Sequence, residues 1–203
     1  MAEVLFCQKI RGERIILNKA VIILAHPNME ESRVNKRWIE EVSGYTDKIT
    51  VHDLYKEYPE WNINIKKEQE ILENHDLVIL QFPFYWYSSP PLLKKWIDDV
   101  FEYDWAYGDD ETADYKLKDK KIGISVTIGE DEAEHSENGK VSFTIDELLS
   151  PFIATINYVG AIHVGNYVLF DAVPETQDKI IDESAKGYVG FILEKLKNWN
   201  GHI

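Results

Sequence analysis

The sequence has few of the residues that mark disulfide-linked, metal-binding or membrane proteins. Its single cysteine, Cys7, can form no disulfide within the chain and no cysteine-based metal site. The six histidines are scattered without the spacing of metal ligands, and we expect no metal. No apolar run approaches the roughly 20 residues of a membrane-spanning helix. A lone cysteine fits a reducing compartment, so we expect a cytoplasmic protein.

Basic residues are also scarce. The chain has 22 Lys and Arg against 36 Asp and Glu, a net charge of −14. Nucleic acids and anionic membranes are bound by basic patches, so we expect neither as a direct partner. With 203 residues, 44% of them apolar, the chain can bury one sizeable core. We expect one domain over residues 19–203, preceded by an N-terminal extension of unknown role, residues 1–18, which lacks the continuous apolar stretch of a secretory signal.

Apolar runs alternate with amphipathic segments along the rest of the chain. Runs such as 19–25 and 76–81 are continuous rather than alternating, which is typical of strands buried on both faces of a parallel sheet. We expect strands over 19–25, 48–55, 76–81, 121–128 and 161–170, and helices over 33–42, 65–74, 91–100, 144–159 (with an irregularity at Pro151) and 177–199. This order predicts an α/β fold: a doubly wound five-stranded parallel sheet with helices on both faces.

Ligands of such sheets bind beyond the carboxyl ends of the strands, where three loops are distinctive. Loop 26–32 ends at Ser32, a natural N-cap, and the free N–H groups of a helix N-terminus suit a phosphate. Loop 81–91 carries five aromatics and three prolines without any charge, which suits a flat apolar ring. Loop 127–139 could close over such a ring. Phe82 and Phe84 are expected to serve mainly as core residues.

With these loops in place, the sequence resembles the flavodoxin-like NAD(P)H:quinone oxidoreductases, which include bacterial ancillary reductases of potassium efflux systems and general stress reductases. The matching pieces run in family order over residues 19–198. They are Leu24-Ala25-His26-Pro27, Ser32-Arg33-Val34-Asn35, Asp53-Leu54-Tyr55, Gln81-Phe82-Pro83-Phe84-Tyr85-Trp86-Tyr87-Ser88, Trp105-Ala106-Tyr107-Gly108 and Glu147-Leu148-Leu149-Ser150-Pro151-Phe152.

The resemblance implies a flavodoxin-like fold, a flavin (FMN, with FAD open), NAD(P)H as electron donor, and two-electron reduction of quinones. It also implies a homodimer with the flavin near the subunit interface. The substrate side would be lined by Trp86 and, from the other subunit, by Trp105 and Tyr107. The flavin contacts that it implies are His26, Ser32, Val34, Asn35, Pro83, Phe84, Tyr85, Trp86, Tyr87, Thr127, Ile128 and Gly129.

The chain departs from the family pattern in its third loop. Where the family commonly has Thr-Thr-Gly-Gly, this chain has Val126-Thr127-Ile128-Gly129, followed by Glu130. We expect the Ile128 side chain to lie where nicotinamide or substrate approaches. A family tyrosine falls near His135 and a family histidine near Ser142. His135 is either a solvated loop residue or a catalytic group that supplies positive charge beside the reduced flavin.

Several alternatives stay open. His26 and Asn35 could be held by the backbone and serve only the structure, and Trp105 and Tyr107 could serve only dimer packing. The chain could be a slowly turning-over ancillary subunit of a membrane potassium efflux transporter. It could also be an azo- or nitroreductase, or a scaffold without flavin. The acceptor and the choice between NADH and NADPH are not readable from the sequence.

Overall fold

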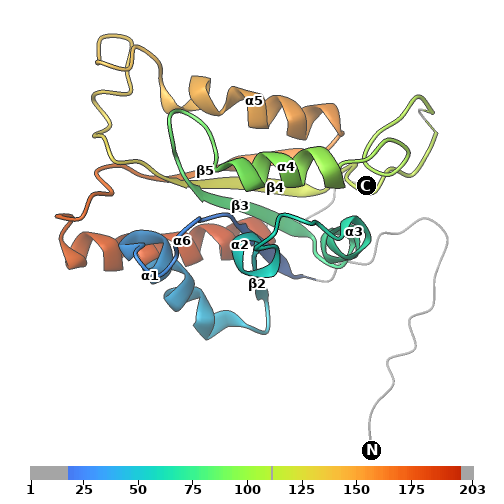
Figure 1. The fold of residues 1–203 in the computed structure, drawn as a ribbon, viewed down its shortest axis with the longest axis horizontal. Coiled ribbons are helices and arrows are strands. Elements are labelled where there is room, and N and C mark those ends of the chain that lie inside the picture. The colour runs from blue at the N-terminus through green and yellow to red at the C-terminus, as the bar shows by residue number, and fades with distance from the viewer. Residues whose placement is uncertain (1–17, 111, 198–203) are drawn as a thin grey trace, which may run out of the picture.

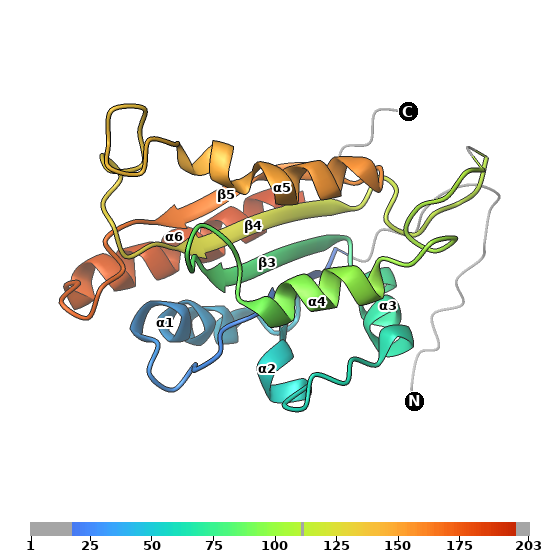
Figure 2. The same cartoon turned by 45° about the horizontal axis from the view of Figure 1, so that its top comes forward.

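The computed structural model of the chain describes residues 18–110 and 112–197 (Figure 1). Its centre is a single all-parallel sheet of five strands in the order β2-β1-β3-β4-β5. The strands are β1 (Ala20–Leu24), β2 (Ile49–Asp53), β3 (Leu77–Pro83), β4 (Lys121–Thr127) and β5 (Ile162–Leu169). The predicted fold class is therefore confirmed, and Figure 2 shows β3, β4 and β5 running side by side between the helices.

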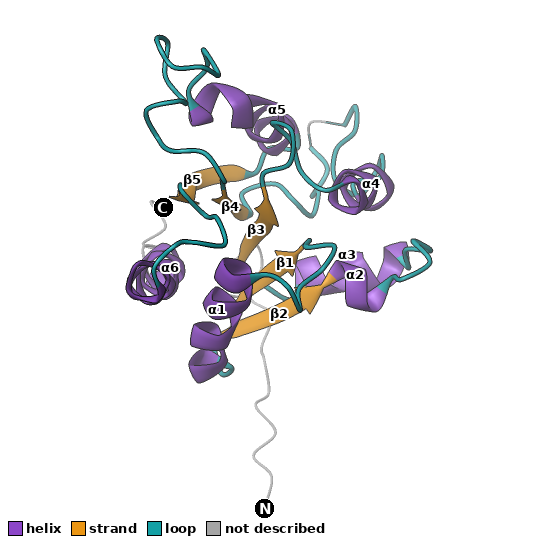
Figure 3. Ribbon diagram, turned by 60° about the vertical axis from the view of Figure 1, so that its left-hand side comes forward, coloured by secondary structure: helices purple, strands orange, loops and turns teal. Residues whose placement is uncertain are grey.

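Helices cover both faces of the sheet (Figures 1 and 3). On one face α1 (Arg33–Val42) and α6 (Asp178–Lys197) share a core cluster with β1 and β3. The second cluster, on the other face, includes α4 (Pro91–Val100) and α5 (Ile145–Tyr158). The remaining helical segments are η1 (Ser43–Tyr45), α2 (Leu54–Glu57) and α3 (Ile65–Glu73).

The burial of the strands follows their sequence. Every residue of β1, β3 and β4 is buried, as the continuous apolar runs of central parallel strands predict. The edge strands β2 and β5 are partly exposed. On the α1 and α6 face, Trp38 stacks on Tyr188 with the ring centroids 4.7 Å apart, which ties the two helices together over the sheet.

Two expected boundaries are wrong by a few residues. The strand predicted over 48–55 ends at Asp53, because its carboxylate caps a short helix, α2, by accepting the N–H groups of Tyr55 and Lys56 at 3.1 and 3.2 Å. Strand β3 runs two residues past the predicted end, to Pro83, because it continues to pair with β4.

Pro151 does not interrupt its helix, since α5 runs continuously from Ile145 to Tyr158, and the irregularity expected there is seen in the hydrogen bonding. Proline cannot donate to the carbonyl four residues earlier, that of Glu147. The Ser150 hydroxyl donates to this carbonyl instead, at 2.6 Å. The side chain before the proline therefore replaces the missing backbone hydrogen bond.

Two expectations fall outside the described residues. The first is the N-terminal extension, of which residues 1–17 lie outside the described residues. The second is the predicted end of the last helix, beyond Lys197. Among the helices that the structure does describe, none is both long and apolar enough to cross a membrane.

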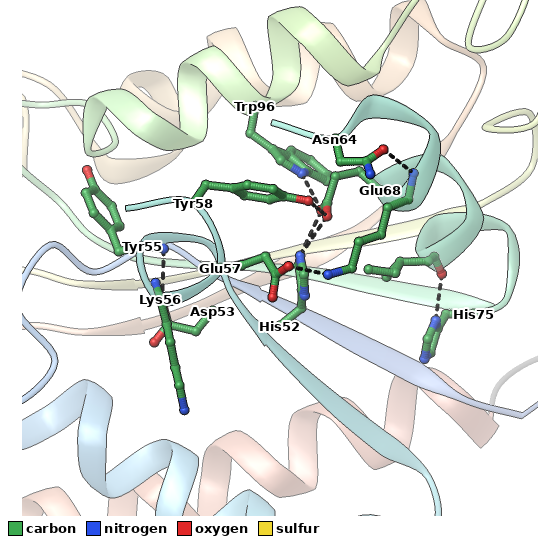
Figure 4. A network of polar contacts seen from close by, with 12 residues as sticks. His52, Asp53, Tyr55, Lys56, Glu57, Tyr58, Asn64, Glu68, His75 and Trp96 are labelled. Atoms are coloured by element: carbon green, nitrogen blue, oxygen red, sulfur yellow. Dashed lines mark hydrogen bonds and ion pairs between the residues drawn. The ribbon is translucent and has the colours of Figure 1, made fainter. Parts of the chain in front are cut away.

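A buried polar cluster joins α3 to the sheet and to α4 (Figure 4). The carboxylate of Glu68, in α3, is fully buried and accepts hydrogen bonds from the Tyr58 hydroxyl and from Trp96 Nε1, the latter at 2.7 Å. His52 Nε2, on β2, lies 2.9 Å from the same carboxylate. Burial raises the pKa of Glu68, but the hydrogen bonds from His52, Tyr58 and Trp96 outweigh it, so the net pKa lies below its usual value.

We predict that Glu68→Gln lowers the free energy of unfolding by about 3 kcal/mol at neutral pH, because an amide leaves buried donors facing its own NH2 group. Since the folded pKa of Glu68 is depressed, its contribution is complete above the ordinary glutamate pKa of about 4.3 and is lost as the pH falls through the folded value. Urea unfolding at several pH values checks both statements.

The matched control is Glu57→Gln, which removes an exposed ion pair with Lys67 in the same region (Figure 4) and should change stability by less than about 0.5 kcal/mol. If Glu68→Gln were as mild as this control, or if its effect did not shrink in acid, the Glu68 cluster would not hold α3 as described.

Candidate functional site

A cavity of about 710 Å³ opens at the carboxyl end of the sheet. Four loops line it, those that follow β1, β3, β4 and β5. It therefore lies at the crevice between β1 and β3, where the strand order reverses. The lining residues are His26, Asn28, Glu31, Ser32, Arg33, Val34, Asn35, Pro83, Phe84, Tyr85, Trp86, Tyr87, Thr127, Gly129, Glu130, His135, Ala172, Val173 and Pro174.

The first loop delivers a helix N-terminus to the cavity. The Ser32 hydroxyl accepts the N–H of Asn35 at 3.2 Å and so caps α1, as predicted. The N–H groups of Arg33 and Val34, in the first turn, have no acceptor inside the helix. Because α1 contains no acidic residue in that turn, the positive end of the helix is open to an anion.

His26 lines the same cavity as this helix end and is a neutral donor. Its Nδ1 accepts the N–H of Asn28 at 3.1 Å, which leaves the imidazole proton on Nε2. Burial lowers the pKa of His26, so the ring is uncharged at neutral pH. The backbone contact that the sequence left open is thus real, and it leaves Nε2 available to a ligand.

The second loop is a tight aromatic hairpin. Tyr85 and Ser88 exchange both backbone hydrogen bonds, at 2.9 and 3.0 Å, across the two-residue tip Trp86-Tyr87. Both tip residues have positive φ, +46° and +63°, a conformation that glycine and asparagine normally supply. The Trp86 side chain is held out into solvent, 91% exposed, at the mouth of the cavity.

Backbone donors in this hairpin are limited. The N–H of Phe84 donates to Thr127 O, and that of Tyr85 closes the hairpin, so donors to a ligand would come from the tip. Phe82 is fully buried in the core, as expected. Phe84 packs against the core and also lines the cavity.

The third loop differs from expectation at Ile128. Its side chain is 1% exposed and belongs to the core cluster under α4 and α5, so it does not enter the space where a substrate would approach. Its N–H donates to Leu169 O and its carbonyl accepts from Ala172 N, which anchors the loop to the end of β5. Ile128 is therefore outside the cavity, whereas its neighbours Thr127, Gly129 and Glu130 line it.

His135 is not a solvated loop histidine. It is 5% exposed, packs against the Phe170 ring at 5.5 Å, and lines the cavity. Its Nδ1 lies 3.2 Å from Asp131 O, an acceptor, so Nδ1 carries the proton. Its Nε2 is buried without a hydrogen-bond partner among the described residues. Such an orphaned atom beside a cavity is the kind of group that a ligand completes.

Trp105 and Tyr107 do not reach the cavity of their own chain. Trp105 Nε1 donates to Glu73 at 2.7 Å, and Tyr107 packs between Tyr103 and Tyr158, with centroids 5.8 and 5.3 Å away. Both lie outside the lining of the cavity. Their assignment to a partner subunit's site stays a prediction.

Sequence reasoning missed the fourth wall, formed by Ala172, Val173 and Pro174 after β5. The signal was available, because all parallel strands end at the same edge and the fifth loop had to lie there too. It also missed Arg33, which lines the cavity but is paired with Asp178 at 2.6 Å and donates to Pro174 O. In the part of the chain that the structure covers, no group of three or more His, Cys, Asp or Glu could hold a metal ion.

The strain in the hairpin tip gives a prediction. We expect the free energy of unfolding of Trp86→Gly to exceed that of Trp86→Ala by about 1 kcal/mol, because only glycine accepts positive φ without a steric cost. At exposed Glu70, inside α3, the order should reverse, with the alanine variant more stable by about 1 kcal/mol. Denaturant melts of the four variants check this, and an alanine variant that is the more stable one at both positions would contradict the strained tip.

The chain is 43% identical over 176 residues to general stress protein 14 of Bacillus subtilis, covering 87% of this chain and 98% of that protein. It is 46% identical over 142 residues to the Bacillus subtilis protein named uncharacterized NAD(P)H oxidoreductase YrkL, covering 70% and 79%. It is 35% identical over 181 residues to the glutathione-regulated potassium-efflux system ancillary protein KefF of Enterobacter sp., covering 89% and 99%.

Two solved structures are similar in fold and sequence. The general stress protein 14 of Treponema denticola, in complex with FMN, matches with a TM-score of 0.81 and 38% identity, over 88% of this chain and 99% of that one. An NADPH-quinone reductase from P. pentosaceus matches with a TM-score of 0.71 and 28% identity, over 84% and 97%. A family model described as the flavodoxin-like fold matches residues 18–191. The chain therefore belongs to the flavodoxin-like fold family.

Proposed function

We propose that the chain is an FMN-dependent NAD(P)H oxidoreductase that reduces quinones or similar flat electrophiles by two electrons. The single observation that carries this is the cavity, which joins a free helix N-terminus, an aromatic hairpin and an orphaned buried imidazole nitrogen at the strand-order reversal. The relative crystallised with FMN and the relatives named NAD(P)H oxidoreductase and quinone reductase support the same assignment.

The residues of the cavity fit a flavin mononucleotide. The first turn of α1 offers two free N–H groups to a phosphate, and His26 Nε2 is a neutral donor in the lining of the same cavity. The aromatic hairpin offers a flat apolar wall from Phe84 to Tyr87. We assign Pro83, Tyr85, Ser32, Val34, Asn35, Thr127 and Gly129 to the same lining, and Ile128 only to the anchoring of the third loop.

When bound, the flavin supplies the chemistry: NAD(P)H, a proton and a quinone become NAD(P)⁺ and a hydroquinone. The chain supplies position, a partly dry slot and fixed dipoles. His135 is the candidate catalytic group. Its unpartnered Nε2 can take up a proton and hold it where negative charge develops, with Nδ1 fixed by Asp131 O. No nucleophile is required.

We further propose a homodimer in which Trp105 and Tyr107 approach the partner's cavity. The aromatic cluster of Tyr103, Tyr107 and Tyr158 supports an interface, since Tyr103 and Tyr158 are 52% and 73% exposed while both pack against the Tyr107 ring.

A second candidate function is that of an ancillary subunit of a potassium efflux transporter, and only the similarity to KefF favours it. Copurification with a transporter, and its activation without turnover, would favour this second role.

The function predicts that purified protein binds FMN and oxidises NADH or NADPH when a benzoquinone is added. FMN fluorescence titration measures the first property and nicotinamide absorbance the second. A protein that retains no FMN, once the added excess has been removed, would overturn the assignment. FMN binding without reductase activity would leave the ancillary role.

We predict that His135→Ala slows flavin reduction by NAD(P)H about tenfold to a hundredfold while FMN still binds, because a group able to hold a proton beside the site is lost. Stopped-flow reduction measures this rate directly. His163→Ala is the control, since His163 sits at the opposite end of β5 and bonds Asn166 at 2.9 Å. An unchanged rate in His135→Ala would remove His135 from the mechanism.

A further inference from the structure

A chain of buried hydrogen bonds runs beneath the cavity and joins Tyr188 and Gln81, which have no assigned role, to Asn35 and Thr127. The Tyr188 hydroxyl, on α6, donates to Gln81 Oε1 at 2.8 Å. Gln81 Nε2, on β3, donates to Asn35 Oδ1 at 3.1 Å. Asn35 Nδ2, on α1, donates to Thr127 Oγ1 at 3.0 Å. The relay therefore crosses one face of the sheet and ends at two residues, Asn35 and Thr127, that line the cavity.

Tyr188, at the end of the relay farthest from the cavity, sets the direction in which the hydrogen bonds are donated. Burial raises the pKa of Tyr188 far more than the nearby Ser125 hydroxyl lowers it, so the phenol keeps its proton at every ordinary pH. The Tyr188 hydroxyl therefore has its own proton to give to Gln81 Oε1. Each amide then accepts on one side and donates on the other, and the Thr127 hydroxyl receives the last bond. Thr127 keeps its own proton to donate into the cavity.

Packing alone does not explain a glutamine at this position. The two residues that precede it on this face of β3, Leu77 and Ile79, are apolar and fully buried. Gln81 is 0% exposed, and an amide in that place is costly unless every polar atom is paired. Its two hydrogen bonds lead only toward Tyr188 and toward Asn35, so the amide serves to connect α6 to the cavity floor.

We propose that Gln81 is a positioning residue for the cofactor site: it fixes the orientation of the Asn35 amide and thereby makes the Thr127 hydroxyl a donor toward the bound FMN. The Asn35–Thr127 hydrogen bond couples α1 to the end of β4. Gln81, which is buried and does not line the cavity, holds the Asn35 amide in the orientation that this bond needs. Gln81 is outside the lining of the cavity, which separates this role from direct binding. The proposal rests on the proposed FMN function.

The test variant is Gln81→Met, which keeps the shape of the side chain and removes both hydrogen bonds. We expect the Kd for FMN to rise about tenfold, the visible spectrum of bound FMN to shift, and its midpoint potential to fall as the donor from Thr127 loses its orientation. The matched control is Gln69→Met. Gln69 is also buried, at 2% exposed, and its amide bonds Val100 O and Glu102 on the other face of the sheet. We expect that variant to lose stability without any change in the spectrum or potential.

A double-mutant cycle separates positioning from general loosening. Gln81 does not contact Thr127 directly in the relay, so independent effects of Gln81→Met and Thr127→Val on FMN affinity would add. If Gln81 acts through the Thr127 hydroxyl, the double variant binds FMN about as weakly as Thr127→Val alone. Additive losses, or a spectrum and potential equal to those of wild type, would overturn the proposal.

Tyr188→Phe keeps the test decisive if Gln81→Met does not fold. It removes only the hydroxyl at the start of the relay, and we expect a smaller shift of the potential in the same direction. An unchanged potential in this variant would overturn the proposal. Wild-type protein is titrated with FMN first: absence of binding there rejects the proposed function itself, whereas wild-type binding with unresponsive variants rejects only the role of Gln81.

Discussion

The reversal of strand order between β1 and β3 is the constraint on which the site depends. The chain leaves β1 for β2 on one side and leaves β3 for β4 on the other, so the loops after these two neighbouring strands diverge. A crevice must open between them. The helix N-terminus after β1 and the aromatic hairpin after β3 form its two sides, and the loops after β4 and β5 add the remaining walls.

An open crevice at the end of a buried sheet needs a polar floor and fixed walls. The floor is the relay from Tyr188 to Thr127, in which the amide oxygen and nitrogen of both Gln81 and Asn35 are paired. The wall after β3 carries backbone strain, with both tip residues at positive φ and one tryptophan held in solvent. Local strain of this kind persists where the surrounding structure enforces it, and it is concentrated at binding sites.

Much of this could be read from the sequence. The continuous apolar runs gave the central strands, Ser32 gave the start of α1, and the uncharged aromatic turn gave one wall of the cavity. Side-chain hydrogen bonds to the backbone were harder to predict from the sequence. Asp53 ends its strand early by capping α2, and the Ser150 hydroxyl donates to the carbonyl that Pro151 leaves without a backbone donor. The prediction for the loop after β4 was wrong at Ile128, because neighbouring residues of an extended segment face opposite sides. Ile128 therefore points into the core, while Thr127 and Gly129 line the cavity. The relay through Gln81 joins residues 35, 81, 127 and 188, and no local pattern reveals contacts over such sequence separations.

The central claim is that one cavity, at the strand-order reversal, holds a flavin by its phosphate at α1 and by its ring at the hairpin. A crystal structure of the protein soaked or grown with FMN tests it most directly. We expect the phosphate at the N–H groups of Arg33 and Val34, and the ring between the hairpin tip and the loop after β4. FMN bound elsewhere, or the ring turned away from Trp86 and Tyr87, would contradict it.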